Sequence, residues 1–122
     1  MAQILVVDDS STVRTEVGDF LKKSGLDVAF AVDGRDGLSK LRADPGVKLV
    51  VCDVNMPNMD GLTMAEKVRG ELGNAGVHIV MLTTENSPVM KERGKAAGIK
   101  GWIVKPFNGD AVLGSFKKMV GV

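Results

Sequence analysis

Five short runs of apolar residues recur along the chain, and segments with helical spacing separate them. The runs occupy residues 4–7, 28–32, 49–51, 77–82 and 102–104. They are rich in valine and isoleucine and mostly do not alternate with polar residues, which is typical of strands that are covered on both faces. Strands that alternate with helices form a parallel sheet with right-handed crossovers. The pattern therefore predicts an α/β fold in which a strand–helix unit occurs five times.

The intervening segments carry capping residues as well as apolar faces. The first helix is expected to bury Val13, Val17 and Leu21, and the third to bury Ala65, Val68 and Leu72. Glycines at 25 and 98 are expected to end the first and fourth helices, and 73–76 is typical of a turn. The expected N-caps are Ser10 or Ser11, Asp33, Thr63 in a capping box with Glu66, Ser87 before Pro88, and Asn108.

Length and composition exclude several classes of protein. The 122 residues fit one domain, and 44% hydrophobic with 25% charged residues is ordinary globular usage, so a disordered chain is excluded. Sixteen basic against fifteen acidic residues leave a net charge of +1, whereas a nucleic-acid-binding domain usually carries a basic excess. We therefore expect no nucleic-acid partner.

The cysteine count and the distribution of apolar residues bear on location. Cys52 is the single cysteine, and no signal sequence precedes the first apolar run, so we expect a cytoplasmic protein. No stretch approaches the roughly 20 apolar residues of a membrane helix, so we expect no membrane association. One cysteine and one histidine also exclude a zinc-ligand cluster.

Polar residues gather where the predicted strands end. Asp8 and Asp9 follow the first strand, Asp53 the third, Thr83 the fourth and Lys105 the fifth. In an open parallel sheet these ends lie at one edge, where ligands bind. Three acids at one place repel one another, so they would either raise the pKa of one of them or recruit a cation. Oxygen ligands without cysteine or histidine favour a hard cation such as Mg²⁺. A carboxylate nucleophile, a hydroxyl, an ammonium group and Mg²⁺ together suit a phosphoryl group.

Each of these residues also has a purely structural interpretation. Asp8 and Asp9 could cap the following helix, and Asp53 could belong to a turn. Thr83 could be a β-branched strand residue, and Lys105 a solvated charge. Their convergence on a single edge favours the functional interpretation.

The motifs at these positions resemble a known family. They are VVDDS at 6–10, DVNMP at 53–57 with DG at 60–61, LT at 82–83 and VKPF at 104–107. Together they resemble the response-regulator receiver domain, in particular its stand-alone chemotaxis (CheY-like) type. The resemblance implies a flavodoxin-like doubly wound fold with a five-stranded parallel sheet in the order 2-1-3-4-5. It also implies one receiver domain over residues 1–122 with no output domain.

The resemblance implies a role for each residue of the site. Asp53 would accept a phosphoryl group from a sensor histidine kinase. Asp9 and Asp53 would bind Mg²⁺ directly with the backbone carbonyl of Asn55, and Asp8 would bind it mainly through water. Thr83 and Lys105 would contact the phosphoryl group, and the bond between Lys105 and Pro106 would be cis.

Four further residues are implied as tuning or switch residues: Asn55, Thr84, Glu85 and Trp102. Asn55 and Glu85 match positions that influence the access of hydrolytic water, although simple loop polarity would also explain them. Trp102 matches a switch aromatic whose ring turns inward in the active state of the family, with a half-buried packing role as the alternative. Thr84 would leave less room for that inward rotamer. A partner protein would bind the face formed by the fourth helix, fifth strand and fifth helix, which includes Lys91, Lys95, Trp102 and Lys117.

These implications predict a phosphorylation switch of a two-component system, acting in chemotaxis, and not a turnover enzyme. A phosphorelay intermediate and a phosphate sink are alternatives within the same class. In a different class, a haloacid-dehalogenase-like phosphatase also uses an Asp nucleophile, Mg²⁺, a hydroxyl and a lysine. That enzyme needs two acids spaced Asp-x-Asp, whereas this chain has Asp53 and Asn55. A nucleotide-binding domain is weaker still, because neither a P-loop nor a GxGxxG motif is present.

Overall fold

The computed structural model describes residues 2–72 and 76–122, and in these ranges strands and helices alternate from end to end. The strands are β1 (Ile4–Val7), β2 (Val28–Ala31), β3 (Leu49–Cys52), β4 (His78–Thr83) and β5 (Gly101–Val104). The helices are α1 (Ser11–Lys23), α2 (Gly34–Ala43), α3 (Gly61–Gly70), α4 (Pro88–Ala96) and α5 (Gly109–Val120). The predicted strand–helix alternation is confirmed, with strand ends displaced by no more than one residue.

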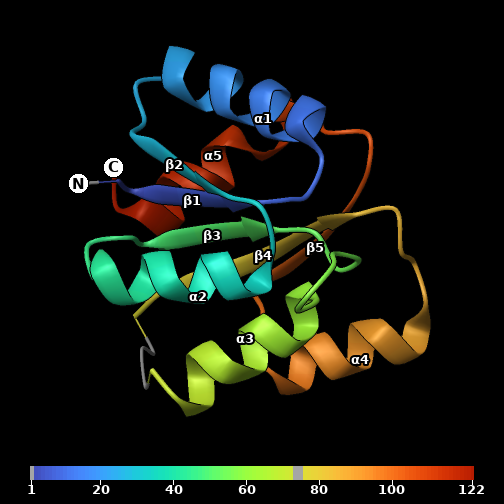
Figure 1. Ribbon diagram of the computed structural model, residues 1–122. Coiled ribbons are helices and arrows are strands. Elements are labelled where there is room, and N and C mark those ends of the chain that lie inside the picture. The colour runs from blue at the N-terminus through green and yellow to red at the C-terminus, as the bar shows by residue number, and fades with distance from the viewer. Residues whose placement is uncertain (1, 73–75) are drawn as a thin grey trace.

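All five strands are parallel and lie in the order β2-β1-β3-β4-β5, which confirms the predicted fold class. Helices α1 and α5 cover one face of the sheet, and α2, α3 and α4 cover the other (Figure 1). The pairing register matters for the site. Val7 lies beside Cys52, and Thr83 lies beside Val104, so the residues that follow these positions emerge at the same edge.

Two apolar cores explain why the strands do not alternate with polar residues. Ile4 and Val6 pack with α1 and α5 residues such as Leu21 and Phe116. Leu5 and Val7 pack on the opposite face in a core that includes the α3 residue Met64. Because both faces of the sheet are buried, both sets of strand residues are apolar.

Four of the five predicted helix N-caps are confirmed, with Ser10 and not Ser11 in the first position. The capping box at Thr63 is wrong. Asp60 caps α3 by accepting a hydrogen bond from the Thr63 N–H at 2.7 Å, so Thr63 lies inside the first turn. Helix α3 ends at Gly70, and Leu72 therefore lies beyond it.

The C-terminal ends of α1 and α4 also follow the sequence pattern. Gly25 and Gly98 have φ of 86° and 84°, the left-handed conformation in which glycine commonly follows a helix. The turn predicted at 73–76 falls, apart from its last residue, outside the described residues. No helix among the described residues is long and apolar enough to cross a membrane.

Candidate functional site

Three carboxylates meet at the edge formed by the ends of β1 and β3. One carboxylate oxygen from each of Asp8, Asp9 and Asp53 lies within 4.8 Å of the others. Asp8 and Asp53 are only 2% and 8% exposed, whereas Asp9 is exposed. The hydrogen bonds between β1 and β3 bring the acids together, because the Asp53 N–H extends this pairing by donating to the Val7 carbonyl at 3.0 Å. The predicted acidic cluster is confirmed as an arrangement.

Asp8 is the most deeply buried of the three acids. Its Oδ1 accepts a hydrogen bond from the Ser10 N–H at 2.9 Å, and its Oδ2 accepts one from Lys105 Nζ at 3.1 Å. Burial raises the pKa of the Asp8 carboxyl above its ordinary value, although both of these bonds oppose the rise. The cluster therefore holds a carboxylate in surroundings that disfavour its charge, and a bound cation would relieve that cost.

Lys105 joins the two buried acids. Its Nζ lies 3.1 Å from Asp8 Oδ2 and 3.1 Å from Asp53 Oδ2, and its peptide bond to Pro106 is cis, as the family resemblance implied. Burial alone would lower the pKa of Lys105, but the bonds to Asp8 and Asp53 outweigh it and raise that pKa above its usual value. A permanent positive charge thus lies against an oxygen of Asp53.

Thr83 completes the predicted set at the end of β4. It is fully buried, and its hydroxyl oxygen accepts a hydrogen bond from the Glu85 N–H at 3.2 Å. The hydroxyl proton is free of that bond, so Thr83 can donate to an anionic group at the edge. Thr84, which follows, is exposed and lies with Lys105 and Phe107 in the wall of a shallow groove.

Glu85 is bonded to two of the other predicted tuning residues. Its Oε1 accepts a hydrogen bond from Asn55 Nδ2 at 2.9 Å, and its backbone carbonyl accepts one from Trp102 Nε1 at 2.8 Å. Trp102 is half-buried on β5. A continuous set of hydrogen bonds therefore runs from Thr83 through Glu85 to Asn55 on one side and to Trp102 on the other.

Sequence reasoning missed Arg14, which contributes to the site from α1. Its Nη1 donates to the backbone carbonyl of Asp8 at 2.6 Å and so brings a guanidinium group beside the acidic cluster. No motif or periodicity in the sequence marks Arg14, because its partner is a backbone carbonyl that only the fold brings within reach.

The chemistry of the donor set fits Mg²⁺. The cluster offers carboxylate oxygens only, and hard cations such as Mg²⁺ prefer oxygen ligands. The exposed Asp9 leaves the cluster open to solvent on one side, which suits an ion that keeps several of its waters. Asp8, Asp9 and Asp53 are thus the residues that would hold the ion.

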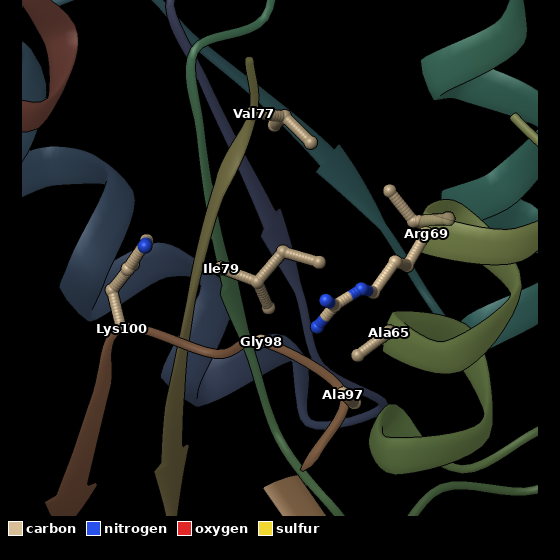
Figure 2. Close-up of a pocket in the computed structure, with 8 residues that line it drawn as sticks. Ala65, Arg69, Val77, Ile79, Ala97, Gly98 and Lys100 are labelled. Atoms are coloured by element: carbon tan, nitrogen blue, oxygen red, sulfur yellow. The ribbon is translucent and has the colours of Figure 1, made fainter. Parts of the chain in front are cut away.

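A separate pocket of about 250 Å³ lies between the end of α3 and the beginning of β4. Figure 2 shows Arg69, Ile79, Gly98 and Lys100 among the residues around it. Its lining contains two basic side chains and no carboxylate, so it offers neither the nucleophile nor the cation ligands of the acidic edge. The chemistry of the molecule is therefore concentrated at the acidic edge and not in this separate pocket.

The fold and the acidic edge define a class of protein, and the comparisons agree with it. Residues 4–117 match the response regulator receiver domain family, and the chain belongs to that family. Its members are signalling switch proteins, not classical enzymes.

Within the family, several of the similar proteins are named chemotaxis proteins. The chain is 42% identical to the chemotaxis protein CheY of Treponema pallidum over 113 residues, which cover 91% of this chain and 77% of the relative. It is 40% identical to Vibrio cholerae CheY4, with a TM-score of 0.88 and 98% of each chain covered. A chain in the structure of a CheX–CheY–BeF₃–Mg²⁺ complex from Borrelia burgdorferi is 25% identical to this chain. The match has a TM-score of 0.87 and covers 98% of this chain and 88% of the other. The chain is thus a CheY-type receiver of two-component signalling, and a dehalogenase-like phosphatase is not favoured.

Proposed function

We propose that the chain accepts a phosphoryl group on Asp53 from a sensor histidine kinase, in a reaction that depends on Mg²⁺. The observation that supports this most directly is the position of Lys105, whose ammonium group bridges the buried Asp8 and Asp53 inside a cluster of three acids. A structural ion pair needs only one carboxylate for one lysine. Among the described residues, Lys105 is the cation that pairs with these carboxylates, whereas Arg14 bonds a backbone carbonyl, and this excess of acids suits a site that takes up further positive charge.

Asp53 supplies the nucleophile. One of its oxygens, Oδ1, accepts a hydrogen bond from the Val54 N–H at 2.7 Å, and the other, Oδ2, faces Lys105. An oxygen of Asp53 forms the new P–O bond while the P–N bond to the donor imidazole breaks, and that electron pair stays on the departing ring. Bound Mg²⁺, held by Asp8, Asp9, Asp53 and the Asn55 carbonyl, would supply charge compensation for the phosphoryl oxygens.

Lys105 and Thr83 then hold the phosphorylated state. Lys105 can move its bonds from the carboxylates to a phosphoryl oxygen without leaving the edge, because it already lies 3.1 Å from Asp53. The Thr83 hydroxyl donates to a second oxygen. Phosphorylation adds a charge of about −1.5 to −2, so these donors are drawn toward Asp53.

The hydrogen bonds through Glu85 give the switch a path to the surface. When Thr83 turns toward the phosphoryl group, its bond from the Glu85 N–H is strained or lost. The same residue holds Trp102 through its carbonyl and Asn55 through its side chain. Asn55 and Glu85 would therefore tune the access of hydrolytic water, and Trp102 would report the state of the site. The exposed Thr84 directly follows Thr83, so it would respond to the movement of that residue.

The output of the switch is the binding of a protein partner in chemotaxis. The proposed surface is the face of α4, β5 and α5, and it includes Lys91, Lys95, Trp102 and Lys117. Family membership and the capture of the Borrelia CheY in a complex with CheX support the binding of a protein partner. We propose action in the cytoplasm, where the buried free thiol of Cys52 stays reduced, with neither nucleic acid nor membrane as a partner. One receiver domain over residues 1–122 is sufficient for this function.

Intact-mass measurement after incubation with a small phosphodonor and Mg²⁺ tests the proposal. The wild-type chain should gain one phosphoryl group, and Asp53→Asn should gain none. Beryllium fluoride, a mimic that does not hydrolyse, should change the Trp102 fluorescence of wild type; this tryptophan is the single one in the chain. Equal labelling of Asp53→Asn, or the failure of both reagents with wild type, would overturn the proposal.

A further inference from the structure

Two loops that are distant in sequence are bound to each other beside the acidic cluster. Asn58 Nδ2, in the loop between β3 and α3, donates to Asp33 Oδ2 at 2.8 Å across 25 residues of chain. The Gly34 N–H donates to the Met59 carbonyl at 3.0 Å, so a second bond joins the start of α2 to the loop between β3 and α3. The proposed chemistry gives neither bond a role, yet one of the two loops carries Asp53 and Asn55.

The Asn58–Asp33 contact is specific in its chemistry. Asn58 has φ of 67°, a left-handed conformation that asparagine adopts more readily than most residues. Asp33 is 8% exposed, and its other oxygen accepts the Asp36 N–H at 2.8 Å as the N-cap of α2. The bonds from Asp36 and Asn58 lower the pKa of Asp33, so at neutral pH both of its oxygens are acceptors.

Glycines allow the close approach on which this arrangement depends. A Cβ at Gly34 would lie 2.6 Å from the Met59 carbonyl oxygen. At the other end of the loop, a Cβ at Gly61 would lie 2.0 Å from the Asp53 carbonyl oxygen, and the Gly61 N–H donates to the Val54 carbonyl at 2.9 Å. The loop is therefore held at its base by Gly61 and at its tip by Asp33 and Gly34.

We propose that Asn58, held by Asp33, is a positioning residue for the acidic cluster. Its bond fixes the loop between β3 and α3 so that Asp53 and the Asn55 carbonyl stay in the geometry that binds a divalent cation. Asn58 touches neither the cation nor the phosphoryl group. The inference rests on the proposed Mg²⁺ dependence and adds to it a residue that sets the affinity of the site.

Two variants break this bond and spare the local fold. Asn58→Gly removes the amide but keeps a residue suited to positive φ. Asp33→Asn keeps an oxygen to cap α2 but turns an amide donor toward the Asn58 donor. The matched control is Asp44→Asn at the other end of α2. Both carboxylate oxygens of Asp44 also accept a hydrogen bond, in this case from the backbone N–H groups of Ala2 and Gly46.

The first measurement is the Mg²⁺ dissociation constant by isothermal titration calorimetry. Loss of a group bonded directly to a metal ligand typically weakens binding by roughly 10–100-fold. Asn58 acts further from the ion, so we expect both variants to weaken Mg²⁺ binding by about three- to tenfold. Asp44→Asn should keep a Mg²⁺ dissociation constant within about twofold of wild type, since Asp44 lies at the opposite end of α2 from the acidic cluster.

The second measurement is amide hydrogen exchange in EDTA, which does not depend on the ion. The Gly34 and Gly61 amides should exchange several-fold faster in both variants, while amides in the middle of β1 and β3 keep their wild-type rates. If both variants bind Mg²⁺ within twofold of wild type, the inference is wrong, even if they are less stable. If wild type itself does not bind Mg²⁺, the proposed function fails first and the inference falls with it.

Discussion

Replacement of Asp8 by asparagine should stabilise the protein in the absence of Mg²⁺. Asp8 is 2% exposed and lies in a cluster with two other acids, and it shares the ammonium group of Lys105 with Asp53. An asparagine keeps an oxygen for the Ser10 N–H and releases Lys105 to pair with Asp53 alone. The substitution therefore removes a buried charge and leaves its neighbours with partners.

The structure sets the size of the effect. At an effective dielectric constant of about 20, like charges at the 4.8 Å upper limit of the cluster repel by about 3.5 kcal/mol, and an ion pair at 3.1 Å gains about 5 kcal/mol. Solvent reduces the repulsion from the exposed Asp9, so the pair interactions of Asp8 nearly cancel. The cost of burying its charge then decides the sign. We expect the free energy of unfolding to rise by about 1–2 kcal/mol, as when destabilising groups are removed from other functional sites.

Urea unfolding followed by Trp102 fluorescence measures this difference. In EDTA at neutral pH and low salt, Asp8→Asn should unfold at higher urea than wild type, whereas Asp27→Asn, which removes an exposed acid, should change stability by less than about 0.5 kcal/mol. Mg²⁺ at about 100 times its dissociation constant should stabilise wild type by about 2.7 kcal/mol and the variant by less. An Asp8→Asn protein that is no more stable than wild type in EDTA would refute the reasoning.

The same variant has a predicted pH dependence. The pKa of Asp8 is raised in the folded state from an ordinary 3.8, so the folded state binds the proton more tightly than the unfolded state. Ionised Asp8 therefore destabilises the fold. The advantage of the variant should be complete above the raised pKa and should disappear as the pH falls to the ordinary value.

Two further substitutions test a close backbone contact and an ion pair outside the acidic cluster. Gly61→Ala would place a Cβ 2.0 Å from the Asp53 carbonyl oxygen, and it should lower the free energy of unfolding by about 2–4 kcal/mol and slow phosphorylation; a loss below 1 kcal/mol in urea would contradict this. Glu66→Gln should cost only about 0.5–1 kcal/mol at pH 7, because the bidentate partners Glu66 and Arg93 are each 44% exposed. Arg93 lowers the pKa of Glu66 below its ordinary 4.5, so ionised Glu66 stabilises the fold, and thermal melts should show the difference vanishing as the pH falls through that lowered pKa.

The sequence was sufficient for the sheet and for the edge that carries the chemistry. A strand buried on both faces needs a continuous apolar run, so the runs revealed the strands, and the first polar residue after each run marked the edge. Asp8, Asp53 and Lys105 were found in this way. The order of the strands came from the family resemblance, because apolar runs indicate that strands exist but not which strands are neighbours.

The start of α3 shows where local patterns fail. Asp60 and Thr63 have the same spacing as Thr63 and Glu66, and all three side chains can take part in a cap. The structure places the first turn at Gly61, where the backbone approaches the end of β3 and the Gly61 N–H reaches the Val54 carbonyl. The close contact of Gly61 with the residues that directly follow β3, and not the local spacing, decides that Asp60 is the N-cap.

By itself, the sequence determined which groups reach the edge of the sheet that carries the acidic cluster, because strand periodicity and chain order fix where each side chain emerges. The tertiary structure alone decided how these groups pair. Lys105 meets Asp8 across 97 residues, Asn55 meets Glu85 across 30, and Asn58 meets Asp33 across 25. Such bonds depend on the packing of loops that have no periodic pattern, so their partners are fixed only when the sheet and helices bring the loops within hydrogen-bonding distance.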